Sequence, residues 1–310
     1  MNRCTSFHTA IESDKLYTHD LEKIRNSALD LENRYESLVI PDIKAACDLF
    51  MPTYLDSSFE DGYVSFEVSP HLANDTNATI ENAKRIWHAI NRPNLMIKVP
   101  ATKAGNIALT ELIYAGINVN ITLLFSLDQV VETWHAYILG LQRRYKEQLP
   151  LANIKSVASF FLSRIDSTVD SKLPDELQGK TAINLAKTAY LIYQEVFSSA
   201  VFMPLKKAGA RSQCLLWAST GTKNPKYSDV MYIEELIGME TINTVPDNTL
   251  DAFRDHGQAL SRLTKDIEKA PKIIDKIKKY IDMQQLGNQL QLNGLKSFEQ
   301  SFDALIELMK

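Results

Sequence analysis

The sequence predicts an α/β protein of the (β/α)8 TIM-barrel type, incomplete at its N-terminal strands. Short apolar runs alternate along the chain with segments of helical periodicity, and this alternation is typical of βα units that build a parallel sheet. The apolar runs are continuous, as expected of parallel strands that are buried on both faces. Neither a G-x-G-x-x-G motif after the first strand nor a G-x-x-x-x-G-K-[ST] motif occurs, which disfavours a doubly wound nucleotide-binding sheet.

The elements follow from periodicity and from the residues at their ends. We expect strands at residues 63–68, 94–100, 117–124, 156–162, 213–218 and 241–245. We expect a helix that begins near Pro41, a favoured first-turn residue, with an apolar face of Ile43, Ala46, Cys47 and Phe50. We expect a second helix that Asp75 caps, with Ile80, Ala83, Trp87 and Ile90 on its apolar face. A third helix is expected at 105–114, a fourth begins at a Ser126–Gln129 capping box, and a fifth is expected at 181–197.

The strand expected at residues 94–100 carries Lys98 within an apolar run that Pro93 and Pro100 bound. A lysine is almost never fully buried unless a partner or a reaction uses its ammonium. Desolvation would favour the free amine, which is the form that attacks a carbonyl to give a Schiff base. The alternative is a lysine near a strand end that reaches solvent or pairs with a carboxylate.

Five successive strands each carry a hydrophilic residue within or at the end of an apolar run. A spacing of two places Asn120 and Thr122 on one face of their strand, and likewise Ser159 and Phe161 on one face of theirs. A barrel directs such residues from different strands toward one site at its C-terminal mouth. The residues in this set are Glu67, Lys98, Asn120, Thr122, Ser159 and Ser219.

Composition and charge exclude several classes of protein. The 310 residues are 45% hydrophobic and 23% charged, as in a globular protein, and no Gly/Ser linker or repeat divides them, so we expect one domain over 1–310. A net charge of −4 gives no basic footprint for nucleic acid. Cys4, Cys47 and Cys214 are too far apart for a zinc pattern or a disulfide framework. The chain has no hydrophobic signal region and no run of membrane-spanning length, so we expect a cytoplasmic protein with no membrane partner.

Long ordered stretches of the chain resemble those of transaldolases, in particular the longer bacterial type. The likeness extends from about Thr5 to the C-terminus, where residues 294–306 are similar to the closing helix of that family, and we expect this helix, 294–310, to pack on the barrel. The stretches that carry it are PNLMIKVPAT (93–102), GINVNITLLFS (116–126), SVASFFLSRID (156–166), LLWASTGTKNPKYSD (215–229) and INTVPDNTLDAFRDHG (242–257).

The resemblance implies a chemistry and assigns roles to matching positions. Lys98 matches the lysine that forms a Schiff base with a ketose phosphate. Glu67 and Thr122 match the pair that, with a water, moves protons while the imine forms. These three are the expected catalytic residues, because imine formation must expel the carbonyl oxygen and needs a positioned acid. Neither a metal nor a cofactor is expected, since the protonated imine is itself the electron sink.

Substrate-binding residues are carried over in the same way. Asn120 and Ser159 match residues that orient the sugar hydroxyls, with Phe161 on the same strand face as Ser159. Arg164 matches a phosphate-binding arginine, whose planar fork suits a phosphate. Without the family, Arg164 could equally form a salt bridge to Asp166 or Asp170. Ser219 matches another residue of that pocket, and Lys223 is expected to supply a second positive charge, although the spacing around it differs from that of shorter transaldolases.

The chain departs from the family at its N-terminus. In the family a first strand carries an aspartate that takes the proton of the sugar hydroxyl, and a second carries an asparagine in a Thr-Ser-Asn-Pro-type turn. Here Cys4-Thr5-Ser6 leads directly into residues 7–11, so neither residue can be assigned. The sequence does not place the alternative bases His8, Asp14 and Asp20 at the barrel mouth. We expect such a barrel to be open, marginally stable or paired in a homodimer.

Three interpretations follow for function. The first is a working transaldolase, which transfers a dihydroxyacetone unit from sedoheptulose 7-phosphate to glyceraldehyde 3-phosphate, giving erythrose 4-phosphate and fructose 6-phosphate in the pentose phosphate pathway. The second is a barrel that forms the Schiff base but cleaves poorly or serves another sugar phosphate. The third is a silent homologue that acts through binding or assembly. The presence of Lys98, Glu67 and Arg164 favours the first two, with weak turnover expected because the aspartate is missing.

Overall fold

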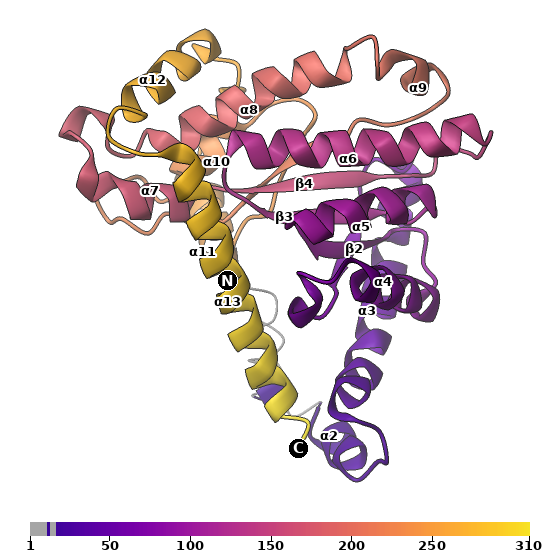
Figure 1. Ribbon diagram of the computed structural model, residues 1–310. Coiled ribbons are helices and arrows are strands. Elements are labelled where there is room, and N and C mark those ends of the chain that lie inside the picture. Colours follow the sequence, from indigo (N-terminus) through magenta and orange to yellow (C-terminus); the bar gives the residue numbers. More distant parts are fainter. Residues whose placement is uncertain (1–10, 13–16) are drawn as a thin grey trace. The chain divides into compact units, whose positions relative to one another are not determined.

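The strands form one parallel sheet whose order follows the sequence. The computed structural model describes residues 11–12 and 17–310, and within them the strand order is β1-β2-β3-β4-β5-β6. Figure 1 labels β2, β3 and β4. The strands are β1 Val64–Glu67, β2 Leu95–Pro100, β3 Val119–Leu124, β4 Ser156–Phe161, β5 Cys214–Ala218 and β6 Thr241–Asn243. All six expected strands are therefore confirmed, each shorter than predicted by one or more residues.

The chain divides into two compact units, each described here by itself. Unit 1 comprises residues 1–120 and 294–310, and unit 2 comprises residues 121–293. The prediction of a single domain over 1–310 stays a prediction. Besides its strands, unit 1 holds α2 Thr18–Arg25, α3 Leu31–Asp56, η2 Pro70–Leu72, α4 Thr76–Ile90, α5 Lys103–Tyr114 and the C-terminal part of α13 Met283–Glu307.

The first long helix of unit 1 begins earlier than predicted. Asp30 caps α3, since its side chain accepts a hydrogen bond from the backbone N–H of Asn33 at 2.9 Å. Pro41 consequently lies inside α3 rather than at its start, and the predicted boundary is wrong. Phe50 is also misplaced by the prediction, because 47% of it is exposed while Ile43 and Cys47 are buried.

Two capping residues fix the helices on either side of β2. Asp75 accepts a hydrogen bond from the N–H of Ala78 at 3.0 Å at the start of α4, as predicted. Thr102 does the same for Gly105 at 2.9 Å at the start of α5. A Cβ at position 105 would collide with the carbonyl oxygen of Pro100, so only glycine lets α5 turn back this closely after β2.

Unit 2 holds the remaining helices. These are α6 Leu127–Lys146, α7 Ser163–Val169, η3 Asp170–Lys172, η4 Asp175–Leu177, α8 Thr181–Phe197, α9 Met203–Lys207, α10 Met231–Leu236, α11 Asp247–His256, η5 Ile267–Lys269, α12 Ala270–Ile277 and the first part of α13. Helix α8 has the bounds that the sequence predicted. Helix α13 begins at Met283 and not near Gly294, where the closing helix was expected to start.

The predicted capping box at the start of α6 is modified in its second half. Ser126 accepts a hydrogen bond from the N–H of Gln129, as predicted. The side chain of Gln129, however, accepts from the N–H of Phe125 at 2.9 Å, one residue earlier than a capping box requires. The cap therefore also fixes the last turn of chain between β3 and α6.

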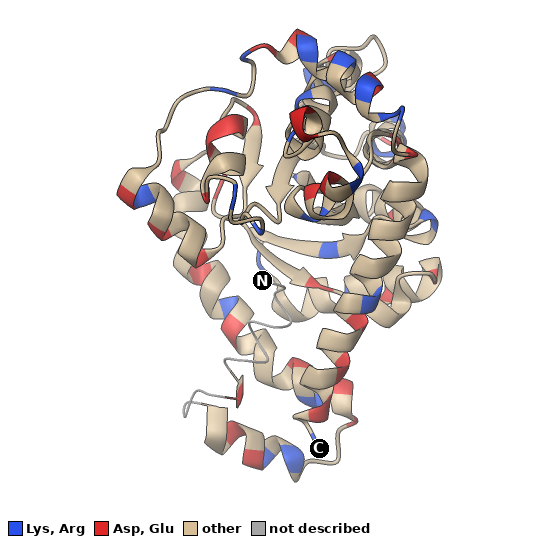
Figure 2. Ribbon diagram, turned by 90° about the vertical axis from the view of Figure 1, so that its left-hand side faces the viewer, with Lys and Arg blue, Asp and Glu red and all other residues tan. Residues whose placement is uncertain are grey.

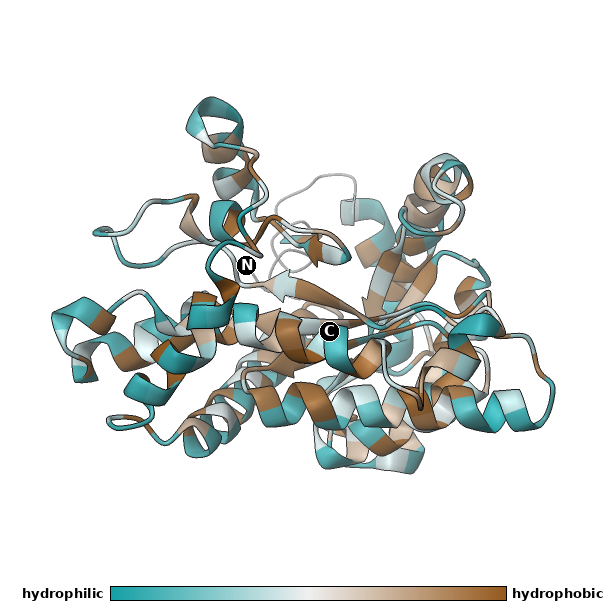
Figure 3. Ribbon diagram, turned by 90° about the horizontal axis from the view of Figure 1, so that it is seen from above, coloured by the Kyte–Doolittle hydropathy of each residue, from teal (hydrophilic) through white to brown (hydrophobic). Residues whose placement is uncertain are grey.

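The apolar core of unit 2 lies between helices and strands. Figure 1 shows α6 and α8 side by side, where Trp134 of α6 meets Tyr193 and Phe197 of α8 with ring centroids 6.0 and 5.9 Å apart. Charged residues concentrate on helices and loops, and the strands are largely uncharged (Figure 2). In Figure 3 the helices carry both hydrophilic and hydrophobic residues, whereas the strands are mostly hydrophobic. A charged side chain on a strand is therefore an exception in this molecule.

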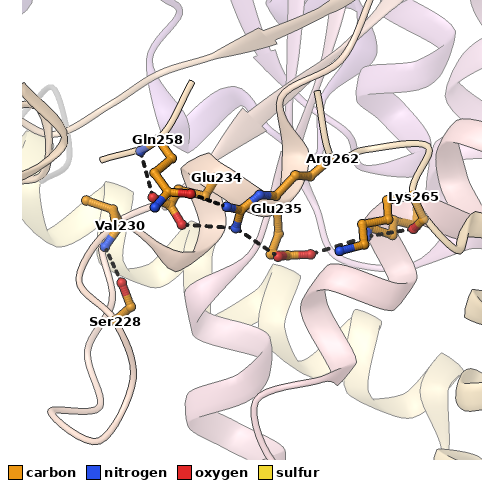
Figure 4. Close-up of polar contacts among 8 residues, drawn as sticks. Ser228, Val230, Glu234, Glu235, Gln258, Arg262 and Lys265 are labelled. Atoms are coloured by element: carbon orange, nitrogen blue, oxygen red, sulfur yellow. Dashed lines mark hydrogen bonds and ion pairs between the residues drawn. The ribbon is translucent and has the colours of Figure 1, made fainter. Parts of the chain in front are cut away.

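A polar network ties α10 of unit 2 to the segment that follows α11 (Figure 4). Arg262 Nη1 lies 3.2 Å from Glu234 Oε2 and 3.6 Å from Glu235 Oε1. Glu235 Oε2 lies 3.3 Å from the ammonium of the buried Lys187, which also donates to the carbonyl of Lys265 at 3.2 Å. The network gives two cations carboxylate partners, and no strand residue takes part in it.

No helix in the described part of the chain is long and apolar enough to cross a membrane.

Candidate active site

The lysine singled out by the sequence faces a carboxylate on the neighbouring strand of unit 1. In the parallel register of β1 and β2, Glu67 is the direct partner of Lys98. The distance from Lys98 Nζ to Glu67 Oε2 is 3.5 Å, and the two side chains are only 13% and 9% exposed. The second carboxylate oxygen, Oε1, is buried and has no hydrogen-bond partner in the part of the chain that the structure describes. One oxygen of Glu67 is thus held at the amine while the other is available for a further polar group.

Two more side chains complete this part of the site in unit 1. The ring of Phe298, on α13, has its centroid 4.9 Å from Lys98 Nζ. Asn120 is buried on β3 and donates a hydrogen bond from its side-chain amide to Ser65 Oγ at 3.1 Å. Ser65 is on β1, two residues before Glu67 and on the same strand face. Lys98 therefore lies among groups that are mostly shielded from water.

Unit 2 begins with an unusual backbone turn beside Thr122. The hydroxyl of Thr122 is fully buried without a hydrogen-bond partner among the described residues. The next residue, Leu123, has a φ of 64°, a left-handed conformation that is rare for a branched side chain within a strand. Gln291 of α13 donates a hydrogen bond to the carbonyl of Leu123 at 3.2 Å. A buried, unpaired hydroxyl next to a strained residue is typical of a functional position.

Arg164 has an aromatic neighbour and, among the described residues, no carboxylate partner. The guanidinium carbon of Arg164, on α7, lies 5.6 Å from the ring centroid of Phe161 at the end of β4. Burial lowers the pKa of Arg164. Burial and, next, the positive charge of Arg164 also lower the pKa of Lys223. The two cations therefore repel each other, and within the described residues neither forms an ion pair with a carboxylate.

The alternative salt bridge for Arg164 is not formed, because both candidate carboxylates have other partners. Asp166 accepts hydrogen bonds from the hydroxyl of Tyr232 at 2.7 Å and from the N–H of Ala182 at 2.9 Å. Asp170 accepts them from the hydroxyl of Tyr227 at 2.7 Å and from the N–H of Gly179 at 2.9 Å. Arg164 and Lys223 are therefore left with positive charge to attract an anion.

Ser219 follows the last residue of β5 and has a φ of 55°, again left-handed. Its Oγ lies 2.8 Å from the Oγ of Ser163, and its carbonyl accepts a hydrogen bond from the N–H of Ser163 at 3.0 Å. Because Ser163 is the first residue of α7, this double contact fixes the end of β5 to the helix that carries Arg164. Ser159 is buried in the middle of β4.

A pocket of unit 2, about 540 Å³ in volume, has Lys223 as the one predicted site residue on its wall. Asp166, Tyr227 and Tyr232 also line it. Burial raises the pKa of Asp166 to about 6. In the described parts of the chain, no three His, Cys, Asp or Glu side chains are grouped so that they could hold a metal ion.

The structure brings the predicted residues together in two groups. In unit 1, Lys98 contacts Glu67, and Asn120 contacts Ser65. Unit 2 holds the other predicted site residues, which are Thr122, Ser159, Phe161, Arg164, Ser219 and Lys223. The joint action of Thr122 with Lys98 stays a prediction. Among the proposed alternative bases, Asp20 is exposed on α2, and His8 and Asp14 lie outside the described residues.

Sequence reasoning missed Phe298, Gln291 and Ser163. Phe298 could have been noticed, since it and Phe302 are four residues apart in a helical pattern and must share a helix face. The contacts of Gln291 and Ser163 depend on backbone carbonyls far away in the sequence, which no local pattern indicates.

Fold and side chains together define a class of protein, an α/β-barrel enzyme with a shielded lysine on a strand and a carboxylate beside it. The sequence model of the family described as Transaldolase/Fructose-6-phosphate aldolase matches residues 5–309. The transaldolase of Thiobacillus denitrificans is 46% identical over 308 residues, which cover 97% of this chain and 86% of that protein. The transaldolase of Neisseria gonorrhoeae is 45% identical over 301 residues, with the same coverage of both chains.

The chain belongs to the transaldolase/fructose-6-phosphate aldolase family. A more distant relative, the transaldolase of Trichodesmium erythraeum, is 42% identical over 322 residues and covers 98% of this chain and 85% of its own. The resemblance found in the sequence is thus confirmed, together with the barrel fold class. The relatives also support the predicted transaldolase activity.

Proposed function

We propose that this protein transfers a dihydroxyacetone unit between sugar phosphates through a Schiff base on Lys98. The observation that carries the proposal is the placement of Lys98 against Glu67 on neighbouring strands, with both side chains about nine-tenths shielded from water. A strand lysine that is shielded from water and lies beside a carboxylate is suited to be the nucleophile that attacks a carbonyl. Fructose 6-phosphate, the ketose phosphate of the predicted reaction, is the substrate that we propose to test first.

In the proposed reaction, Nζ of Lys98 adds to the C2 carbonyl of the ketose, and the resulting carbinolamine loses its C2 hydroxyl as water. Glu67 protonates the departing oxygen, which its distance of 3.5 Å from Nζ supports. Its second oxygen, Oε1, has no hydrogen-bond partner among the described residues, so it can accept a hydrogen bond from a water that carries the proton. The part of Thr122 in this proton transfer stays a prediction. The product is a protonated imine, which carries a positive charge on nitrogen.

Cleavage follows from that charge. The C3–C4 bond breaks, its electron pair moves toward the imine nitrogen to give an enamine, and the C4 hydroxyl loses its proton to a base. An aldose phosphate leaves, and the enamine then attacks the carbonyl carbon of the acceptor aldose phosphate by the reverse steps. Hydrolysis of the new imine releases the product ketose and regenerates the amine of Lys98.

Arg164 and Lys223 are proposed to hold the phosphate of the sugar. Both are cations without a carboxylate partner among the described residues. Burial and, next, the charge of Arg164 lower the pKa of Lys223, and a bound phosphate would offset the repulsion between the two cations. Asn120 and Ser159 are proposed to orient sugar hydroxyls, and Phe161 and Ser219 to shape the site.

We further propose that the protein acts in the cytoplasm as part of the pentose phosphate pathway. Homodimer formation is left as a prediction.

The test is a chemical trap followed by turnover. Fructose 6-phosphate and borohydride should attach a reduced adduct to Lys98, which peptide mapping by mass spectrometry would locate. Turnover of fructose 6-phosphate should require erythrose 4-phosphate as the acceptor, because the enzyme is a transferase. Steady release of dihydroxyacetone without an acceptor would instead indicate an aldolase, and an adduct on another lysine would refute the role of Lys98.

A further inference from the structure

The aromatic ring beside Lys98 has no role in the proposed reaction so far. Phe298 is only 2% exposed, and its ring centroid lies 4.9 Å from Nζ of Lys98. The one charged group of unit 1 that forms an ion pair with Nζ, among the described residues, is Glu67 at 3.5 Å on β1. Nζ therefore has a proton acceptor on one neighbour and a ring that cannot accept a proton on another.

The face of an aromatic ring attracts a cation, and the attraction grows when the cation is withdrawn from water. In the proposed reaction, Nζ must carry a positive charge when the C3–C4 bond breaks, because only the protonated imine withdraws the electron pair. A neutral imine at the same place would leave the intermediate unable to cleave. Any group that favours the cation without taking its proton therefore favours cleavage.

We propose that Phe298 is a positioning residue that holds the Schiff-base nitrogen in place and keeps it protonated. The inference rests on the proposed role of Lys98 and adds to it a source of charge stabilisation that the carboxylate cannot supply. Glu67 can pair with the cation, but it can also remove the proton, whereas the ring of Phe298 can only stabilise the charge. The two neighbours of Nζ thus have different functions, proton transfer for Glu67 and charge retention for Phe298.

The helix that carries Phe298 is anchored by other contacts in unit 1. Phe302, one turn further along α13, meets the ring of Tyr35 edge-on with centroids 5.8 Å apart. Asp303 Oδ1 lies 2.7 Å from His71 Nε2, on the short helix η2 that follows β1. These contacts hold the helix independently of the ring of Phe298. Phe298→Leu therefore removes the ring face, and Phe197→Leu, which changes a buried phenylalanine on α8 of unit 2, is the matched control.

The experiment measures single-turnover release of glyceraldehyde 3-phosphate from fructose 6-phosphate across a range of pH. With Phe298→Leu, the pH at which the rate falls on the alkaline side should decrease by about 0.4 to 1.5 units, the range expected for loss of one cation–π contact. The rate relative to wild type should be near one at low pH and about 3- to 30-fold lower on the alkaline limb. Phe197→Leu, assayed well below its melting temperature, should keep the wild-type profile.

A second variant separates the charge of the ring from its shape. Replacement of Phe298 by 3,4,5-trifluorophenylalanine retains size and packing but removes most of the negative charge from the ring face. The alkaline limb should move in the same direction as in Phe298→Leu. An unchanged profile for the fluorinated protein, or a loss of rate equal at every pH, would refute the inference. Wild-type protein that forms no borohydride adduct on Lys98 would refute the proposed function and this inference with it.

Discussion

The two units of this chain treat their buried cations in opposite ways. In unit 1, Lys98 has a carboxylate 3.5 Å from its nitrogen and a ring 4.9 Å away. In unit 2, Arg164 and Lys223 are near each other, and the two aspartates closest in sequence to Arg164 are occupied by tyrosine hydroxyls. If the proposed roles hold, the cation that reacts has a proton-transfer partner beside it, whereas the cations that bind a phosphate have no carboxylate partner among the described residues. The predictions below test this contrast.

Loss of the lysine itself should have the largest effect. Lys98→Ala removes the proposed nucleophile, so both the borohydride adduct and turnover of fructose 6-phosphate with erythrose 4-phosphate should disappear. Lys103→Ala, at an exposed position on α5, is the control and should retain both. If Lys98→Ala still formed the adduct, the nucleophile would be another lysine. The contrast between Lys98 in unit 1 and the cations of unit 2 would then lose its basis.

Loss of the carboxylate beside the lysine should come next. Glu67→Gln keeps the shape but cannot donate or accept the transferred proton, so the rate of imine trapping should fall by about 10²- to 10⁴-fold. Glu81→Gln, exposed on α4, should match wild type in the same stopped-flow assay. A rate close to wild type for Glu67→Gln would show that the carboxylate only pairs with Lys98.

In unit 2, Asp166 should make stability depend on pH. Burial raises its pKa from 3.8 to about 6, so the folded state holds this proton more tightly than the unfolded chain does. The proton on Asp166 therefore stabilises the folded state fully below pH about 4, and this stabilisation is lost as the pH rises to about 6. The loss in free energy of unfolding is about 3 kcal/mol. The difference in free energy of unfolding between wild type and Asp166→Asn should fall by that amount over this range, as measured by urea denaturation.

A control for this titration is Asp251→Asn, an exposed change on α11, which should keep the pH dependence of the wild type. If wild type and Asp166→Asn lose stability in parallel between pH 4 and 6, Asp166 is ionised throughout. It would then be free to pair electrostatically with the cations of unit 2, and the contrast between the units would be weakened.

Removal of the guanidinium should weaken substrate binding more than catalysis. For Arg164→Ala we expect KM for phosphorylated sugars to rise by roughly 10- to 150-fold, the effect of losing a charge-assisted contact of ~1.5–3 kcal/mol, with a smaller change in kcat. Arg164→Lys should recover part of the loss, because it restores charge without the planar fork. Arg254→Ala, exposed on α11, should leave KM unchanged, and an unchanged KM for Arg164→Ala would assign Arg164 a structural role.

The smallest effect is expected in the polar network of α10, where cations and carboxylates pair as they do not at Arg164 (Figure 4). Glu234→Gln should lower the free energy of unfolding by about 1 kcal/mol, since it weakens contacts to Arg262 and to the N–H of Gln258. Asp275→Asn breaks a well-exposed pair with Lys278 and should have no measurable effect. If both variants had the same free energy of unfolding, the network would contribute no more to stability than an exposed ion pair does.

Much of the fold could be predicted because local rules and tertiary packing agree in this chain. The helix over 181–197 and the caps at Asp75 and Ser126 follow from side chains a few residues apart, and the structure has them as predicted. The helix expected from Pro41 fails for an equally physical reason. Proline is favoured at a first turn but is also tolerated inside a long helix, and the cap that decides the start is at Asp30.

For the candidate site, the sequence by itself determined which residue types are available and which strands carry them. The sequence shows a lysine in an apolar run, a glutamate on the preceding strand and an arginine after β4. It also indicates the family to which the chain belongs. Only the tertiary structure decided the partners. Glu67 and Lys98 are 31 residues apart and meet through strand register, Asp166 turns to Tyr232 rather than to Arg164, and Phe298 reaches Lys98 from the far end of the chain. These contacts join residues that are far apart in the sequence. No local pattern specifies them, because distant contacts form only when the whole unit has packed.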